Sequence, residues 1–174
     1  MKLVLRAVLI VSVSSALIYG LNAYCYRPLH CNVVQSQVEA RTLNAFRSIG
    51  SLNSGIMARK NLRDLNPCAD ICSSNPNYYM IKAANFQITG ETVAAVHEYE
   101  HALLYDRRPE IYLNLGLMLL QLGNTAAGER ALVSAGLFNP DMIDEIPYEE
   151  VRASVRRQVS ATITSWSARY ARDR

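Results

Sequence analysis

The stretch PEIYLNLGLMLLQLGNTAAGERALVSAGLFNP, residues 109–140, has the pattern of two short helices that fold against each other. Leucine recurs so densely in residues 112–122 that a helix there keeps almost no polar face and has to be covered on most sides. Gly123 and Asn124 interrupt this pattern, and residues 125–137 return to a helical spacing of apolar side chains. Small residues occur on both helices and allow their backbones to approach closely: Gly116, Ala127, Gly128 and Ala135.

The same pattern occurs earlier in the chain. Residues 79–102 align with residues 112–135 at a constant offset of 33, and large and small side chains alternate at the same places. The aligned pairs are Tyr79 with Tyr112, Ala83 with Gly116, Phe86 with Leu119, Gly90 with Gly123, Ala95 with Gly128, Tyr99 with Leu132, and Ala102 with Ala135. A period near this length, with helix, turn and helix in each unit, is typical of stacked helical repeats.

These two units resemble the tetratricopeptide repeat (TPR) family, whose pattern is a large residue, Leu-Gly, an aromatic residue, then Ala, an aromatic residue, Ala and Pro. The second unit carries this pattern as Tyr112, Leu115-Gly116, Leu119, Gly128, Leu132, Ala135 and Pro140. The first unit lacks the closing proline and has Asp106-Arg107-Arg108 before Pro109. The resemblance implies two units, about residues 76–108 and 109–142, with a degenerate third unit upstream. An irregular helical bundle is the alternative.

We therefore expect an all-α protein: an N-terminal transmembrane helix, a short TPR-like solenoid of helical hairpins, and a C-terminal helix that caps its apolar end. The expected divisions are a membrane anchor (1–24), a linker (25–33), a degenerate helical pair with a cysteine-containing turn (34–75), two TPR-like units (76–142) and the capping helix (143–174). Apolar residues recur every three or four positions along the capping helix, at Val151, Val155, Val159, Ile163, Trp166 and Tyr170.

Residues 7–21, AVLIVSVSSALIYGL, carry no charge and follow the basic residues Lys2 and Arg6. With the flanking apolar residues this stretch is long enough to cross most of a bilayer as a helix. We expect an uncleaved anchor over residues 1–24; a cleaved signal peptide is the alternative, although residues 21–23 form a poor cleavage site. The basic start predicts a cytoplasmic N-terminus, hence a single-pass protein of the bacterial inner membrane with a periplasmic C-terminal domain.

The chain has four cysteines, an even number that suggests two disulfides when a domain lies outside the cytoplasm. Of the three connectivities we expect the local one, Cys25 with Cys31 and Cys68 with Cys72. Free thiols in either pair are one alternative. A metal site made of these four cysteines and His30 is another, although neither spacing matches the usual CxxC zinc knuckle.

The segment His97-Glu98-Tyr99-Glu100-His101 fits the motif H-E-x-x-H on a predicted helix. This motif sets two imidazoles on one face for zinc, with the glutamate as general base toward a bound water. A zinc metalloprotease that uses His97 and His101 is therefore the alternative function, with Glu129 as the candidate third ligand. Against it, position 100 is charged where such proteases favour uncharged residues, and a helix face of exposed His and Glu is the simpler explanation.

Binding is the function that a stacked repeat favours, because its first helices line a concave groove. The resemblance implies that this groove is lined by Asn77 and Glu110 and by the positions expected to bind a partner: Met80, Ala84, Gln87, Ile88, Leu113, Leu117, Leu120 and Gln121. These positions are mostly apolar, so either a partner or the chain's own terminal helix is expected to fill the groove.

The composition narrows the function further. The net charge is only +3, with 18 basic and 15 acidic residues interspersed, which argues against a nucleic-acid partner. Apart from the histidine motif, no catalytic constellation occurs, and no cofactor is expected. We expect a non-enzymatic scaffold that contacts the lipid bilayer through its N-terminal helix. As an accessory or assembly subunit, it would bind the protein subunits of a membrane complex in secretion, envelope building, respiration or photosynthesis.

Overall fold

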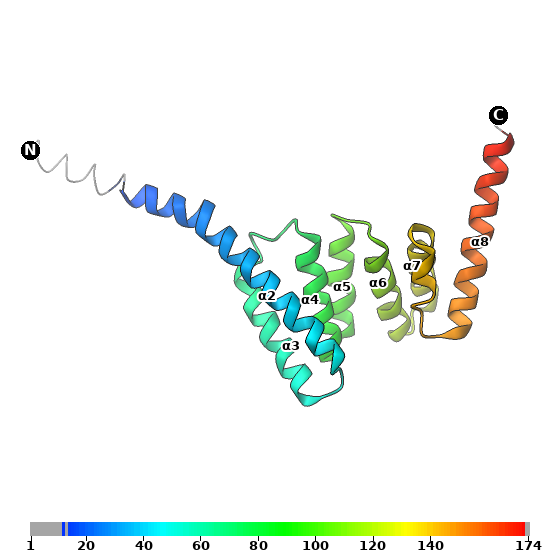
Figure 1. Cartoon of the computed structure of the whole chain (residues 1–174), viewed down its shortest axis with the longest axis horizontal. Helices are drawn as coiled ribbons and strands as arrows, with labels where there is room; N and C mark the ends of the chain where they lie inside the picture. Colours follow the sequence, from blue (N-terminus) through cyan, green and yellow to red (C-terminus); the bar gives the residue numbers. More distant parts are fainter. Residues whose placement is uncertain (1–11, 13, 173–174) are drawn as a thin grey trace, which may run out of the picture.

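The computed structural model describes residues 12 and 14–172, and all regular elements in this part of the chain are helices, which confirms the expected all-α class. In chain order they are η1 (Asn22–Tyr26), α2 (Arg27–Arg47), α3 (Leu52–Leu65), η2 (Asn66–Cys68), α4 (Pro76–Thr89), α5 (Thr92–Leu103), α6 (Pro109–Gln121), α7 (Thr125–Phe138), η3 (Pro140–Ile143) and α8 (Glu149–Arg172). Figure 1 shows α2 to α8 side by side in a row, with α2 and α8 at opposite ends. Each helix packs mainly on its neighbours in the sequence.

The two aligned sequence units form two similar hairpins, α4 with α5 and α6 with α7. Pro76 and Pro109 are the first residues of α4 and α6, where the missing N–H is not needed. Gly90 and Gly123 follow α4 and α6 with φ angles of 81° and 78°, a backbone conformation that favours glycine and lets the chain turn. The second helices, α5 and α7, also begin 33 residues apart. The offset seen in the sequence is therefore an offset between equivalent structural positions.

Small residues bring the two helices of each hairpin together. In the second hairpin, a Cβ atom added to Gly116 would lie 2.7 Å from the Leu132 side chain and 3.0 Å from the Gly128 backbone oxygen. Only glycine fits such an approach without a shift of the neighbouring atoms. In the first hairpin the equivalent positions are Ala83 and Ala95, both fully buried. The close approach expected of the second hairpin is confirmed at Gly116 and Gly128.

The N-terminal hairpin, α2 with α3, is fastened by a disulfide between Cys31 in α2 and Cys68 in η2, whose Cα atoms lie 5.5 Å apart. The expected local pairs are therefore wrong. Cys25 and Cys31 lie on one continuous helical path, where six residues span about 9 Å, too far for a disulfide. Cys25 is exposed and Cys72 is buried, both as free thiols. Burial is the main cause that raises the pKa of the Cys72 thiol, and the nearby negative charge of Asp70 adds to it.

A buried polar network joins α2, α3 and α4. Asn61 and Asn85 are fully buried, and Asn61 Nδ2 donates to Asn85 Oδ1 at 2.9 Å. Asn85 Nδ2 in turn donates to Thr42 Oγ1 at 2.8 Å and to the Ile81 backbone oxygen at 2.7 Å. Thr42 Oγ1 donates to the Val38 backbone oxygen at 2.8 Å. These contacts link the N-terminal hairpin to α4 by hydrogen bonds rather than by apolar packing alone.

The expected linker, residues 25–33, is helical instead. Residues 14–21 are helical, the π-helical turn η1 follows, and α2 starts directly after it. The wider π turn comes just before Pro28, where the proline ring and its missing N–H would disturb an ordinary α-helix. Residues 1–11 and 13 of the expected anchor lie outside the described residues. Within the described part, no helix has both the length and the apolar character needed to cross a bilayer.

The C-terminal helix α8 packs on α7 and η3 with its first half. Val155 and Val159 are buried against α7 and η3, as the capping pattern predicts. Further along, Ile163 and Trp166 are about half exposed, at 47% and 50%. The expected stripe is therefore not covered along its whole length, because α8 has 24 residues whereas α7 has 14. Figure 1 shows the end of α8 running beyond its neighbour.

Replacing Cys31 and Cys68 together by alanine removes the cross-link. We expect the free energy of unfolding to fall by about 3–4 kcal/mol, because a disulfide across 37 residues restricts the unfolded chain. Denaturant unfolding followed by circular dichroism measures the change. Cys25→Ala is the matched control and should leave the unfolding midpoint unchanged. A non-reducing digest that yields Cys68 linked to Cys72 would contradict the assignment.

The variant Asn85→Ala tests the polar network. It leaves Asn61 Nδ2 and Thr42 Oγ1 without their Asn85 partner in a buried site, so we expect a loss of about 2–3 kcal/mol in the free energy of unfolding. The exposed Asn53 in α3 provides the control Asn53→Ala, which should change the same quantity by less than about 0.5 kcal/mol. Equal effects of the two substitutions would mean that the network does not hold the hairpins together.

Candidate functional site

A groove of about 290 Å³ lies between α2, α4 and α6. Its apolar lining comes from Leu43 and Phe46 of α2 and from Met80 and Ala84 of α4. Leu43 is 60% exposed, so an apolar side chain faces solvent in the groove. The structure thus brings two of the predicted partner-binding residues, Met80 and Ala84, together with Leu43 and Phe46, which were not predicted to bind a partner.

Polar side chains also line this groove. Asn77, Arg108 and Asn114 line it, and Arg108 Nη2 donates a hydrogen bond to Asn77 Oδ1. The Arg108 guanidinium also pairs with the Asp106 carboxylate, and its Nη2 lies 3.2 Å from the Met80 sulfur. The groove therefore combines apolar side chains with the guanidinium of Arg108, which is held by partners in the same chain.

The other predicted partner-binding residues lie elsewhere. Leu113 is buried, at 9% exposure, in the cluster that contains Val155 and Val159 of α8, and Leu117 and Leu120 pack against the same cluster. These three leucines thus belong to a core that α7, η3 and α8 complete, and α8 itself packs mainly on α7.

Neither Gln87 nor Ile88 of α4, nor Gln121 of α6, lines the groove between α2, α4 and α6. Gln87 Oε1 instead accepts a hydrogen bond from the Tyr99 hydroxyl at 3.4 Å. The repeat pattern did not reveal the α2 side of the groove, because the aligned units of the sequence begin only at residue 79. The spacing of Leu43 and Phe46 along the expected helix was the only signal in the sequence for those positions.

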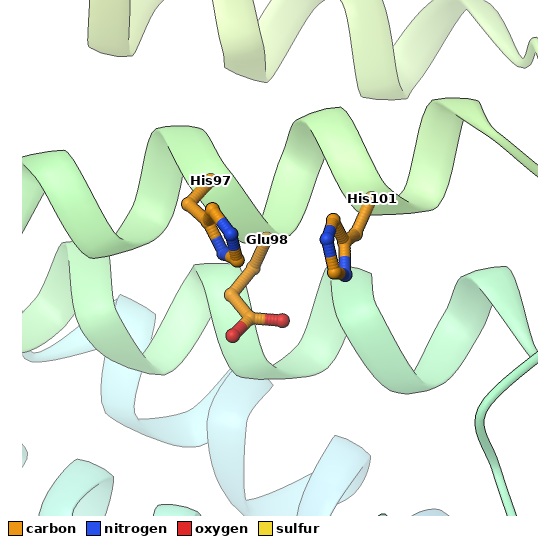
Figure 2. Close-up of side chains that lie close together, drawn as sticks. All are labelled: His97, Glu98 and His101. Atoms are coloured by element: carbon orange, nitrogen blue, oxygen red, sulfur yellow. The ribbon is translucent and has the colours of Figure 1, made fainter.

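A second cluster is formed by the H-E-x-x-H segment on α5. His97 and His101 are one helical turn apart and lie on the same face, with ring centroids 4.5 Å apart. One ligand atom from each of His97, Glu98 and His101 can be chosen so that all three lie within 4.8 Å of one another. Figure 2 shows the two rings on the same side of α5, with the Glu98 carboxylate beside them and directed toward the neighbouring helix.

The neighbours of Glu98 hold its carboxylate in place. Glu98 is 8% exposed, and its Oε1 accepts from Lys82 Nζ of α4 at 2.7 Å. The Lys82 ammonium also lies over the Tyr78 ring, 5.5 Å from its centroid. Burial is the main cause that raises the pKa of Tyr78 to about 12, and the negative charge of Glu98 is the next largest. Burial also raises the pKa of Tyr79, whose ring meets that of His101 edge to face.

The histidine cluster opens onto a surface cavity of about 730 Å³. The cavity walls come from the end of α4, the start of α5 and Leu122, and both His97 and Glu98 line it. The cluster is therefore reachable from solvent, although the carboxylate itself is buried.

The third ligand considered for a zinc protease is not brought to this cluster. Glu129 lies on α7, and its Oε2 accepts hydrogen bonds from two residues of α8: from Ser154 Oγ at 3.2 Å and from Gln158 Nε2 at 3.1 Å. Glu98 is held by Lys82, an arrangement that is unfavourable for a general base, which has to be free to accept a proton. The contacts thus do not favour the protease alternative.

Comparisons with protein-family models, with curated proteins and with solved structures found no match to this chain. Its function is therefore inferred from its own residues and their contacts.

Proposed function

We propose that the protein is a membrane-anchored, extracytoplasmic TPR-like scaffold that acts as an accessory or assembly subunit of a larger membrane protein complex. The observation that carries this proposal is the open groove between α2, α4 and α6, in which Leu43 is exposed beside Phe46 and Met80. An apolar groove on a stacked helical solenoid is a typical surface for a peptide or helix of another protein.

The groove suits an apolar segment with one polar group. Apolar contact would come from Leu43, Phe46, Met80 and Ala84. Hydrogen bonds would come from the amides of Asn77 and Asn114 and from the guanidinium of Arg108. Burial of a leucine-sized side chain in such a groove contributes about 1.5–3 kcal/mol to binding. The proposed occupant is therefore an apolar helix or strand of a partner subunit, oriented by a polar contact to the Arg108 end.

The equivalent positions of the two hairpins support the TPR-like part of the proposal. The helix starts and the turn glycines repeat at 33 residues, within the range of helical repeats. The hairpin of α2 and α3 is the candidate for the degenerate third unit. α8 acts as the terminal cap that such arrays require for solubility.

The helical segment before α2 supports a membrane anchor. Leu17, Ile18, Tyr19, Leu21 and Tyr24 are each more than half exposed. No charged residue occurs between Arg6 and Arg27 in the sequence. Exposed apolar side chains along an uncharged helix are stable in lipid and unfavourable in water, and tyrosines near its end suit the headgroup region.

The disulfide supports an extracytoplasmic location. Cross-links such as Cys31–Cys68 persist in oxidising compartments and are rare in the cytoplasm. With Lys2 and Arg6 on the cytoplasmic side, the helical domain would lie in the periplasm of a bacterium, close to the inner membrane. The partner complex would be one of secretion, envelope building, respiration or photosynthesis.

The variant Leu43→Gln tests the groove. The side chain is already exposed, so the fold should be unaffected, whereas a bound apolar segment would lose its contact. We expect the amount of partner that co-purifies in mild detergent to fall about tenfold. Leu52→Gln is the matched control, because Leu52 is 78% exposed and lies outside the groove, and it should retain the partner. Equal retention by both variants would remove the groove from the proposal.

The anchor is tested separately by the intact mass of the native protein and by its extraction from membranes. We expect the mass to include residues 1–23 and the protein to stay in the membrane at alkaline pH, because an uncharged apolar helix partitions into lipid. Release into the soluble fraction with residues 1–23 missing would indicate a cleaved signal peptide, and would leave the groove proposal intact.

A further inference from the structure

The cluster on α5 has the composition of a metal site. His97 and His101 supply two imidazoles from one helix face, and Glu98 supplies a carboxylate oxygen, with the chosen ligand atoms within 4.8 Å of one another. Atoms that share one Zn²⁺ lie about 3–4 Å apart, because each is about 2.0–2.2 Å from the ion. Small rotations of the side chains would close the remaining gap.

An unpaired carboxylate oxygen is the second, independent observation. Glu98 Oε1 accepts from Lys82, but no hydrogen bond within the described residues reaches Glu98 Oε2, which is shielded from solvent. A buried carboxylate oxygen without a partner is unfavourable by about 1–3 kcal/mol or more, so native proteins rarely leave one in this state. The carboxylate lies beside the two imidazole rings (Figure 2), and an ion bound by all three side chains would supply the missing partner.

We propose that His97, His101 and Glu98 form a binding site for a divalent transition-metal ion of the zinc class, with Glu98 as the third ligand. This proposal goes beyond the scaffold function and does not depend on it. Two imidazoles with one carboxylate select Zn²⁺, Ni²⁺ or Cu²⁺ over Mg²⁺ and Ca²⁺, which prefer oxygen ligands. The site differs from that of a zinc protease because Glu98 ligates the ion.

The surroundings define what such an ion would meet. Lys82 fixes the carboxylate from the outer side, as hydrogen-bonded partners of metal ligands usually do. Three protein ligands leave a fourth position open, and His97 and Glu98 border the cavity of about 730 Å³. The open position would take water or an anionic or imidazole group that enters from this cavity.

Calorimetric titration of chelator-treated full-length protein with Zn²⁺ tests the site. The Cys25→Ser background removes the exposed thiol, which could bind zinc by itself. We expect one ion per chain, and a decrease in affinity of at least about tenfold in each of His97→Gln, His101→Gln and Glu98→Gln. His30→Gln is the matched control, because His30 is exposed on α2 and stacked on Tyr26, and it should bind as the background does.

The Glu98→Gln variant could weaken the ion pair with Lys82 and so affect folding. His97→Gln does not have this problem, because His97 is exposed and its substitution leaves the fold intact. A Cu²⁺ paramagnetic resonance spectrum provides an independent measure and should show two nitrogen ligands, reduced to one in His97→Gln. Absence of Zn²⁺ binding would overturn the proposal. Unchanged binding in the His97→Gln and His101→Gln double variant would overturn it as well. Binding that is lost in both histidine variants but retained in Glu98→Gln would overturn the role of Glu98.

Discussion

A pair of short apolar helices cannot hide both of its faces, and this constraint shapes the molecule. The contact between Gly116 and Gly128 closes one side of the second hairpin, where the backbones approach as closely as side chains permit. The remaining faces have to be covered by other helices. The N-terminal hairpin, α2 with α3, covers one end of the row, and α8 covers the other with Val155 and Val159. The row of helices in Figure 1 follows from this need.

The N-terminal hairpin is held by a different kind of contact. In the α6–α7 hairpin the two helices meet at small residues, whereas the Cys31–Cys68 disulfide ties α2 to η2 within the N-terminal hairpin. The hydrogen bonds of Asn61 and Asn85 then join this hairpin to α4. Hydrogen bonds between buried amides require one geometry, so they fix how the N-terminal hairpin sits on α4. That position sets the wall of the groove, because Leu43 lies on the same helix as Thr42.

The two candidate sites belong to different parts of the solenoid. The groove is lined mainly by α2, α4 and α6, whereas the histidine cluster lies on α5 and opens onto a cavity that shares no lining residue with the groove. A partner segment in the groove and an ion at His97 and His101 could therefore be bound together. Tyr99 is the close neighbour of both, since it lies between Glu98 and Glu100 on α5 and its side chain reaches the groove.

Local sequence was enough to predict the helical class, the two hairpins at an offset of 33 and the helix that caps them, because periodicity, prolines and glycines act over a few residues. It also identified His97, Glu98 and His101 as possible ligands through their spacing. Only the tertiary structure could decide that Cys31 joins Cys68, that Leu113 is buried in the cluster that α8 completes, and that Lys82 leaves one Glu98 oxygen unpaired. Each of these depends on residues from different helices, and their meeting is set by how the hairpins stack.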